Sequence, residues 1–251
     1  ILSAINHGVW QSRPYLVYDL FDGRSVGSAL DEARREDKLI DLKLVEALFD
    51  RVYPALDGMG ESYEVIFVND GSRDRTGQVL AELQQQCPGL PLRVVTHQAN
   101  QGYGAAVASA LDAATKDLIF FTDGDQQFDV REVGLLLEAM DATTDLMIGY
   151  RRQRADPPLR LLNAWGWKQL VNGLFGYTAR DVDCAFKVFH RRVLERVGIS
   201  SIGAFVNSEL LVRALAAGFR IKEVPVGHYP RLAGRATGAR LDVIGRACWE
   251  L

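Results

Sequence analysis

Two carboxylates and an amide near the middle of the sequence have the spacing of a metal site. Asp123 and Asp125 flank Gly124, and Gln127 follows two positions later. On an extended turn, side chains two residues apart point to the same side, and the glycine leaves room for a ligand. Hard divalent cations such as Mg²⁺ prefer carboxylate oxygens and complete their shell with water and substrate phosphates. The segment therefore indicates a divalent-metal site, although aspartates that cap a following helix would give the same pattern.

A second polar turn lies earlier in the chain. Asn69, Asp70, Gly71 and Ser72 directly follow the apolar run 63–68. A carboxylate in this position can accept hydrogen bonds from a nucleoside base or a ribose. Aspartate and serine also favour ordinary strand-to-helix turns. Because one turn can do both, both interpretations stay open.

A glycine-containing segment follows at 100–104. Gly102 and Gly104 open an alanine-rich helical stretch, but the segment lacks a complete G-x-G-x-x-G pattern and a Lys-Ser/Thr pair. This argues against a dinucleotide-binding oxidoreductase and against a P-loop protein. We expect instead that the glycines let the helix pack close to the sheet beside a ligand.

Arginines gather around a Pro-Pro pair in the second half of the chain. The arginines concerned are Arg151, Arg152, Arg154 and Arg160. A guanidinium group matches phosphate with a planar fork of donors, so a diphosphate or a phosphorylated acceptor would suit this cluster. A solvated basic surface is the alternative.

Two aspartates further on are candidates for a general base near an acceptor. Asp181 and Asp183 precede an apolar run, and a carboxylate there could take a proton from a reacting group or simply form a turn. His97, His190 and His228 have no metal-ligand spacing. We therefore expect these histidines to be structural or peripheral.

Short apolar runs alternate with helical stretches along most of the chain, which is typical of an α/β protein with a parallel sheet. Strands are predicted at 63–68, 92–96, 118–122, 146–149 and 186–189, with an extended stretch at 220–226 and a weaker strand candidate at 14–20. Helices are predicted to about 86 and at 105–114, 130–140, 161–174 and 208–217. Such sheets bind ligands at the carboxyl ends of their strands, and both acidic turns fall there.

Composition excludes several classes of protein. The 251 residues are 48% hydrophobic, so a sizeable core can form, and the net charge of −3 argues against a protein that mainly coats nucleic acid. The three cysteines are widely spaced, which predicts neither a disulfide framework nor a zinc site. Neither a bilayer-spanning run nor a signal peptide is expected. These features predict a soluble, cytoplasmic chain that can still sit on a membrane surface.

Taken in order, these motifs resemble those of family 2 glycosyltransferases, in particular the dolichol- and polyprenyl-phosphate sugar transferases. Residues 69–76 resemble D-D-G-S-x-D-x-T, 100–106 resemble N-x-G-x-G-x-A, 123–127 resemble D-A-D-x-Q, and 181–187 resemble D-x-x-x-G-F-K/R. Residues 223–226 and 228–234 resemble the closing E-V-P-V and Y-P-R-x-x-G segments. The resemblance covers about residues 45–251, and the ordered set is much more specific than any single motif.

The resemblance implies a GT-A fold, a Rossmann-like α/β domain with a mostly parallel central sheet flanked by helices. It implies inverting transfer from a UDP- or GDP-hexose to a polyprenyl phosphate at the cytoplasmic face of a membrane, with Mg²⁺ or Mn²⁺ as cofactor. By motif match, the metal ligands are Asp123, Asp125 and Gln127. The nucleotide-sugar residues are Asn69, Asp70, Gly71, Ser72, Gly102, Asp123 and Arg231. Arg151 and Arg160 lie near the acceptor phosphate, and Asp181 and Asp125 are the catalytic candidates.

Three departures from the family pattern affect these expectations. No apolar strand ending in P-x-Y/F-N-E precedes residue 45, so residues 1–44 form a divergent segment that either replaces or lacks the first strand and part of the donor site. Asn69 replaces an acid, and Ala185 replaces a glycine on the acceptor side. An active transferase formed by 45–251 is the main hypothesis, and a catalytically impaired nucleotide-binding or scaffold protein is the alternative. The sugar, the base and the oligomeric state do not follow from the sequence.

Overall fold

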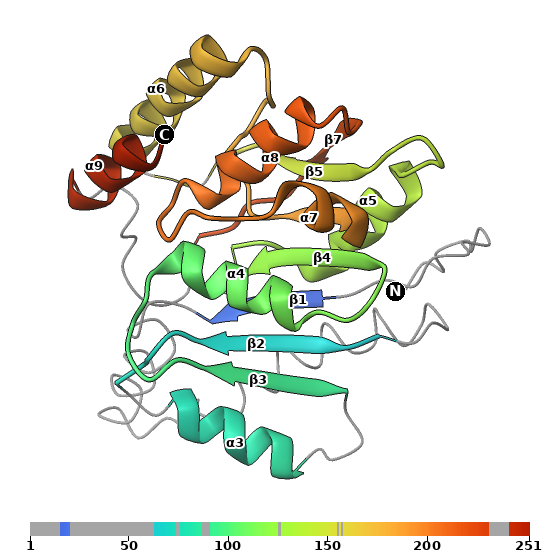
Figure 1. The fold of residues 1–251 in the computed structure, drawn as a ribbon, viewed down its shortest axis with the longest axis vertical. Coiled ribbons are helices and arrows are strands. Elements are labelled where there is room, and N and C mark those ends of the chain that lie inside the picture. Colours follow the sequence, from blue (N-terminus) through green and yellow to red (C-terminus); the bar gives the residue numbers. More distant parts are fainter. Residues whose placement is uncertain are drawn as a thin grey trace.

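The computed structural model describes residues 16–20, 63–73, 76–86, 91–124, 127–154, 156, 158–230 and 241–251. Two predicted site residues, Asp125 and Arg231, lie outside these ranges. The described parts form a central sheet with helices on both faces (Figure 1), as the alternation of apolar and helical stretches predicts.

The sheet has the strand order β3-β2-β1-β4-β6-β5-β7 over the described part of the chain. The strands are β1 (Leu16–Leu20), β2 (Val65–Asn69), β3 (Leu92–Thr96), β4 (Leu118–Asp123), β5 (Leu146–Arg151), β6 (Lys187–His190) and β7 (Ile221–Val226). All neighbours pair in parallel except β6, which is antiparallel to both β4 and β5. The prediction of a mostly parallel sheet is therefore confirmed.

Strand β1 lies within residues 1–44, the segment that the resemblance to family 2 glycosyltransferases does not cover. It pairs in parallel with β2 and with β4, so that Leu16 is opposite both Val65 and Phe120. The strand expected within 14–20 is confirmed. The sequence leaves open whether residues 1–44 replace the first strand or lack it, and residues 16–20 supply a strand between β2 and β4. The domain division at residue 44 stays a prediction.

The reversed strand β6 matters for the position of the site. Lys187, at the start of β6, is opposite Phe121 near the end of β4 and Ile148 in β5. In antiparallel neighbours, the start of one strand lies beside the end of the other. The residues that precede β6 are therefore brought to the same edge of the sheet as those that follow β4 and β5.

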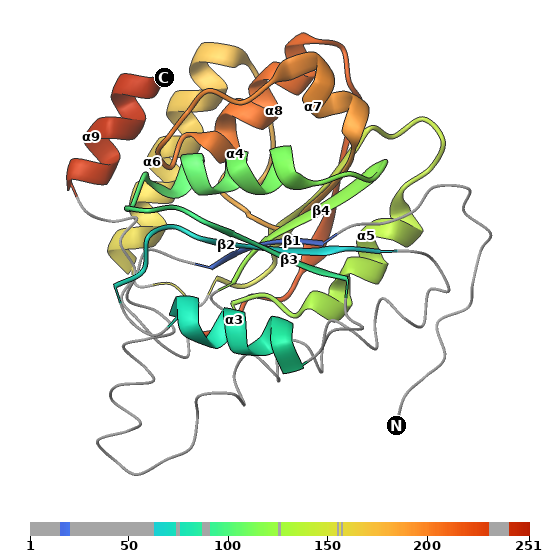
Figure 2. The same cartoon turned by 60° about the horizontal axis from the view of Figure 1, so that its bottom comes forward.

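Helices cover the two faces unequally, as Figure 2 shows: α3 and α5 lie on one face, and α4, α6, α7 and α8 on the other. The helices are α3 (Thr76–Gln86), α4 (Tyr103–Ala113), α5 (Val133–Ala139), α6 (Pro158–Phe175), α7 (Arg191–Val197), α8 (Val206–Ala216) and α9 (Leu241–Glu250). Helix α6 begins at Pro158, earlier than predicted, because proline is well suited to the first helical position. None of the described helices is long and apolar enough to cross a bilayer.

Alternate residues of the strands feed two cores. Val65 and Phe67 pack on the face that α3 and α5 cover, and Ile66 and Val68 pack on the opposite face. Successive side chains of a strand point to opposite faces, so a strand buried on both sides reads as an unbroken apolar run. These two cores hold the sheet rigid beneath its polar carboxyl edge.

Candidate active site

Three strands end in residues that sequence analysis assigned to the site. Asn69 ends β2, Asp123 ends β4 and Arg151 ends β5. Since these strands run in the same direction, their last residues share one edge of the sheet. The prediction that the motifs fall at the carboxyl ends of strands is confirmed.

The carboxylate of Asp70 joins two predicted motifs. Its oxygens accept hydrogen bonds from the backbone N–H groups of Gln101 (2.8 Å) and Gly102 (2.9 Å), and one of them lies 2.6 Å from Nδ1 of His97. Nε2 of His97 lies 2.8 Å from the hydroxyl of Ser109 in α4. Asp70 is thus a buried brace that fixes the glycine segment. His97 is structural, as expected, although its partners could not be read from the sequence because they are distant in the chain.

A cleft of about 530 Å³ lies beside this brace, at the ends of β2 and β3. It is lined by Asn69, Gly71, Ser72, Arg73, Gly77, Thr96, His97, Gln98, Ala99 and Asn100. Oδ1 of Asn69 accepts a hydrogen bond from the backbone N–H of Ser72 (3.0 Å), which closes the turn. Three of the residues predicted to bind the nucleotide therefore line one cleft, while Asp70 contacts the glycine segment.

Gly71 and Gly104 are required by close backbone approaches. Gly71 has φ of 67°, and a Cβ there would lie 2.4 Å from the carbonyl carbon of Ala99. A Cβ on Gly104 would lie 2.4 Å from the carbonyl oxygen of Ser201, and its N–H donates to the carbonyl of Ile202 (3.0 Å). Helix α4 packs on the sheet as predicted, since Ala106 and Ala110 share a core with Ile66 and Val68. The close approach of Gly104 itself is to the segment before α8.

Asp123 stands at the end of a chain of hydrogen bonds that begins in the core. The hydroxyl of Tyr103 donates to Oδ1 of Asp123 (2.9 Å), and Nδ2 of Asn207 donates to that hydroxyl (3.0 Å). Nζ of Lys187 donates to Oδ1 of Asn207 (2.7 Å) and to the carbonyl of Cys184. Burial lowers the pKa of Lys187 to about 8. The orientation of the motif aspartate is therefore set by residues of α4, β6 and α8.

The oxygen donors of the metal motif suit a hard cation. Asp123 is partly exposed at the strand end, where a carboxylate can meet a ligand. Gln127 is buried, and its side-chain amide donates to the carbonyl of Tyr229 (3.3 Å), two residues before Arg231. Within the described ranges, no group of three His, Cys, Asp or Glu side chains could hold a metal. The predicted site depends on Asp125, which lies outside those ranges.

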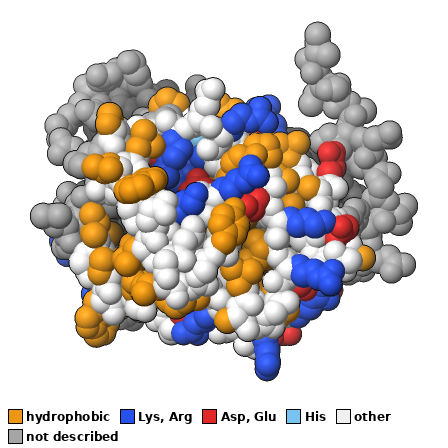
Figure 3. Space-filling view, turned by 90° about the horizontal axis from the view of Figure 1, so that it is seen from above, with side chains coloured by type: hydrophobic (Ala, Val, Ile, Leu, Met, Phe, Trp, Pro, Cys, Tyr) orange, Lys and Arg blue, Asp and Glu red, His pale blue; other side chains and the backbone are white. Residues whose placement is uncertain are grey.

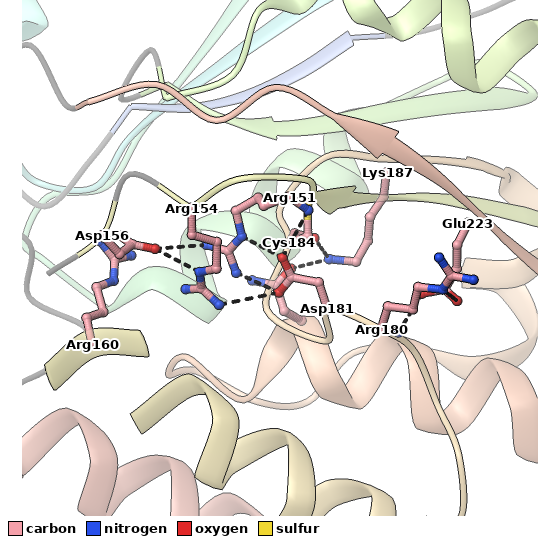
Figure 4. Close-up of polar contacts among 10 residues, drawn as sticks. Arg151, Arg154, Asp156, Arg160, Arg180, Asp181, Cys184, Lys187 and Glu223 are labelled. Carbon is pink, nitrogen blue, oxygen red and sulfur yellow. Dashed lines mark hydrogen bonds and ion pairs between the residues drawn. The ribbon is translucent and has the colours of Figure 1, made fainter. Parts of the chain in front are cut away.

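Arginines and aspartates form a compact cluster at the end of β5 and the start of α6 (Figure 4). The guanidinium of Arg151 donates two hydrogen bonds of 2.6 Å to the carboxylate of Asp181. Arg154 and Arg160 each approach Asp156 at 2.9 Å. The side chains of Arg151 and Asp156 are only 4% and 1% exposed. Three arginines thus share two carboxylates, which leaves one formal positive charge in a largely buried place.

The same cluster separates the two predicted general bases. Burial alone would raise the pKa of Asp181, but the hydrogen bonds and charge of Arg151 lower it below its usual value. Burial, and then the neighbouring charge of Asp181, raise the pKa of Asp183 to about 6. Burial, followed by the charge of Arg151, lowers the pKa of His228 to about 4. Asp181 is therefore a fixed anion that orients Arg151.

Some members of this cluster are predicted from the sequence. Arg151, Arg160 and Asp181 were expected in the site, and the structure places all three in one network. Asp156 was not predicted, since its only signal was its place among the arginines, and His228 was expected to be structural or peripheral. The substituted residue Ala185 is buried in the core.

Comparison with known proteins agrees with this geometry. Residues 42–198, more than half of the chain, match the model of the family "Glycosyl transferase family 2". A dodecaprenyl-phosphate galacturonate synthase of Rhizobium johnstonii is 30% identical over 193 residues, which are 76% of this chain and 56% of the relative. A polyprenol monophosphomannose synthase of Mycolicibacterium smegmatis is 29% identical over 185 residues, 68% of each chain.

A solved structure confirms the predicted fold. Glucosyl-3-phosphoglycerate synthase from Mycobacterium tuberculosis, in complex with Mn²⁺, UDP-glucose and phosphoglyceric acid, superposes with a TM-score of 0.66 at 18% identity, over 95% of this chain and 79% of that one. This likeness confirms a GT-A fold. The chain spans only 56% and 59% of the length of two of its curated relatives. The family match, the fold and the order of the motifs agree, and the chain belongs to glycosyl transferase family 2.

Proposed function

We propose that this chain is a metal-dependent inverting glycosyltransferase that moves a hexose from a UDP- or GDP-sugar to a polyprenyl phosphate. The observation that carries the proposal is the arginine cluster beside Asp181, at the same sheet edge as Asp123 and the cleft of β2 and β3. Relatives named as polyprenyl-phosphate synthases support the acceptor class. A structural neighbour that holds Mn²⁺ and UDP-glucose supports the donor class.

The donor nucleoside would occupy the cleft lined by Asn69, Gly71 and Ser72. Its volume of about 530 Å³ is in the range of small-molecule sites. Asp70 would act indirectly, by holding Gly102 and its neighbours in place. Arg231 is proposed to contact the diphosphate.

Asp123, Asp125 and Gln127 would hold a Mg²⁺ or Mn²⁺ ion. Such an ion, when bound, stabilises the negative charge of a departing diphosphate. The contribution of the chain is to fix the carboxylate of Asp123 through Tyr103 before the donor arrives. A carboxylate oriented in advance spends less conformational entropy on binding.

The acceptor phosphate would bind among Arg151, Arg154 and Arg160. One of its oxygens attacks the anomeric carbon, the bond from that carbon to the diphosphate oxygen breaks, and the electron pair leaves with the diphosphate. A phosphate oxygen is already a nucleophile, so the step needs little general-base help. Asp181, held as an anion against Arg151, orients the phosphate-binding group. Phosphate binding by the arginines and the orientation of Arg151 by Asp181 both stabilise charge in a partly buried site, where such interactions are strong.

A polyprenyl phosphate resides in a bilayer, so we also propose that the protein works peripherally at the cytoplasmic face of a membrane. The alternative, a nucleotide-binding or scaffold protein without turnover, keeps its basis in the missing P-x-Y/F-N-E segment. A transferase forms a sugar-lipid product and the alternative protein forms none, so a measurement of that product distinguishes them.

The first test is calorimetric titration of UDP and of GDP into the protein with Mn²⁺, and again with EDTA. We expect one nucleotide to bind only with metal, and Asp125→Ala to lose that binding without a change in the free energy of unfolding. A transfer assay with the matching UDP- or GDP-hexose and a polyprenyl phosphate follows. Nucleotide binding without any sugar-lipid product would favour the scaffold alternative, and no binding of either nucleotide would remove the proposed donor site.

A further inference from the structure

Helix α6 exposes large apolar side chains along its length. Six of them are exposed, and we call them the α6 apolar surface: Leu161, Leu162, Trp165, Leu170, Leu174 and Phe175. Leu162 and Trp165 are each 61% exposed, and Leu174 is 58% exposed. At about 100° per residue around the helix axis, Leu161, Leu162 and Trp165 share one side of α6, and Leu170 and Leu174 form a second pair farther around the helix. Exposed apolar patches of this kind mark an interaction site.

The charges of α6 identify the chemistry of its partner. Arg160 and Lys168 are the charged residues between Pro158 and Phe175, and no acidic residue occurs in that range. A helix that combines exposed Trp and Leu with basic residues has the composition of a segment that lies in the interface of an anionic bilayer.

The opposite side of α6 holds the helix to the domain. Val171 is fully buried, and the indole N–H of Trp167 donates to the hydroxyl of Ser208 in α8 (3.0 Å). Its ring also packs edge-on against Phe205. Trp165 and Trp167 lie two residues apart, about 200° around the helix axis. One tryptophan therefore faces out while the other is anchored against the domain.

A second helix lies beside α6 and also exposes a tryptophan. Helix α9 lies beside α6 in both Figure 1 and Figure 2, and its Trp249 is 87% exposed. Figure 3 looks onto the top of Figure 1 and shows apolar side chains gathered on the left, the side of α6 and α9, with basic side chains next to them. Tryptophan is enriched at membrane–water interfaces.

The α6 apolar surface is continuous with the proposed acceptor site. Arg160, in the first turn of α6, pairs with Asp156 at 2.9 Å, inside the arginine cluster. An acceptor whose phosphate lay among these arginines would have its apolar tail next to the same helix. A bilayer against α6 would thus bring a lipid headgroup and the site together.

We propose that the α6 apolar surface, with Trp249, is the face on which this protein docks to an anionic bilayer. The inference rests on the proposed function for the identity of the acceptor, but the docking itself is independent of turnover. The face inserts Leu162 and Trp165 at the level of the lipid headgroups. Lys168 contacts anionic lipid phosphates beside them.

The test uses the native tryptophans as depth probes. Each of two variants keeps a single tryptophan, Trp165 or Trp167, with the others of the four replaced by phenylalanine. Both are mixed with vesicles of phosphatidylglycerol and phosphatidylcholine that carry brominated acyl chains. We expect strong quenching and a blue shift for Trp165 and little change for Trp167. Equal quenching of both, or of neither, overturns the proposal.

Co-sedimentation with the same vesicles supplies the matched variants. Leu162→Glu is expected to lower the bound fraction at least tenfold, and pure phosphatidylcholine vesicles to bind the wild type much more weakly than anionic ones. Leu135→Glu, at a leucine 46% exposed on α5, is expected to bind like the wild type. Equal loss in both variants would contradict a specific face. So would a stable dimer in analytical ultracentrifugation that Leu162→Glu dissociates, since a second copy would then cover α6.

These outcomes are separable from the failure of the proposed function. Metal-dependent nucleotide binding is measured without vesicles, and Leu162 lies outside the donor cleft and the arginine cluster. A Leu162→Glu variant that keeps nucleotide affinity but loses vesicle binding supports docking through α6. A wild type that binds nucleotide but not anionic vesicles overturns the docking proposal alone.

Discussion

The proposed nucleotide side and the proposed acceptor side of the site are built differently. On the nucleotide side, Asp70 accepts hydrogen bonds from the backbone N–H groups of Gln101 and Gly102, so main-chain groups form a cradle around its carboxylate. On the acceptor side, charged side chains pair with one another, as Arg151 does with Asp181. A main-chain cradle tolerates a changed neighbour such as Asn69, because the backbone groups remain. A cluster of paired charges responds to the loss of any member.

The largest effect is expected on the acceptor side, for Asp181→Asn. The variant removes the charge that holds a buried guanidinium, so we expect transfer kcat/KM to fall on the order of 10²-fold. The free energy of unfolding should fall by about 3 kcal/mol, as for other broken buried pairs. Transfer kinetics and denaturant unfolding measure the two effects.

A matched control is Lys222→Met, which breaks the exposed pair between Lys222 and Asp141. It should change the free energy of unfolding by less than about 1 kcal/mol. An Asp181→Asn variant as active as this control would mean that Arg151 does not depend on its partner.

On the nucleotide side, Asp70→Asn keeps the size of the side chain but turns part of the acceptor into a donor. Backbone N–H groups of the glycine segment lose a partner, which costs about 2 kcal/mol for a buried group. We expect nucleotide affinity to fall about tenfold or more, measured by calorimetry, while vesicle binding stays unchanged. Unaltered nucleotide affinity would show that the brace does not shape the donor site.

Two helical glycines, one in α4 and one in α6, are expected to respond to alanine substitution with opposite changes in stability. A methyl at Gly104 would overlap the carbonyl of Ser201, whereas one at Gly166 on α6 meets nothing within 4 Å. Gly104→Ala should lower the free energy of unfolding by about 1–3 kcal/mol. Gly166→Ala should raise it by about 0.5–1 kcal/mol, because alanine favours the helix. Thermal or denaturant unfolding of both variants tests the pair, and similar values would contradict the close approach at Gly104.

The acceptor side should also impose a pH dependence. The pKa of Asp183 is raised from its usual 3.8 to about 6. Between these values Asp183 binds fewer protons in the unfolded chain than in the folded one, so its contribution to stability falls as pH rises from about 4 to about 6. Asp183→Asn lacks this loss, and its stability relative to wild type should improve by about 2 kcal/mol from pH 4 to pH 7. Parallel stability curves of the two proteins across that window would refute the raised pKa.

The smallest effect is expected where the two sides meet, at Tyr103. Tyr103→Phe removes one hydrogen bond to Asp123 and leaves the ring in place, a loss of about 1 kcal/mol. The apparent Mn²⁺ affinity in nucleotide binding should weaken a few-fold. Tyr177→Phe, which removes an exposed bond to Glu223, serves as the control. Equal Mn²⁺ affinity in the two variants would mean that the hydrogen-bond chain from Lys187 to Tyr103 does not orient the carboxylate of Asp123.

The sequence predicts the parts of the fold that depend on local pattern. The apolar runs that become β2, β4 and β5 are largely buried on both faces, so each reads clearly, and the turn that ends each strand marks the site edge. The direction of β6 was not predictable in this way, because a four-residue strand has the same pattern whether it runs parallel or antiparallel.

Contacts between distant residues explain what was missed in the site. His97 meets Asp70 across 27 positions, and Asn207 meets Tyr103 across 104. No local spacing records such pairs. Lys187 looks like an ordinary strand residue in the sequence, and only its complete burial gives it a special pKa. Residue type identified the chemistry, while tertiary packing decided the partners.

The clasp between Arg151 and Asp181 has a consequence for evolution. These residues stand at the two ends of the excursion that contains α6, and their bond ties its base shut. A loop whose ends are already held together changes its length or composition at a small cost in closure entropy. A change in the length or composition of the segment that holds α6 is thus expected to leave the sheet and the Asp70 brace as they are.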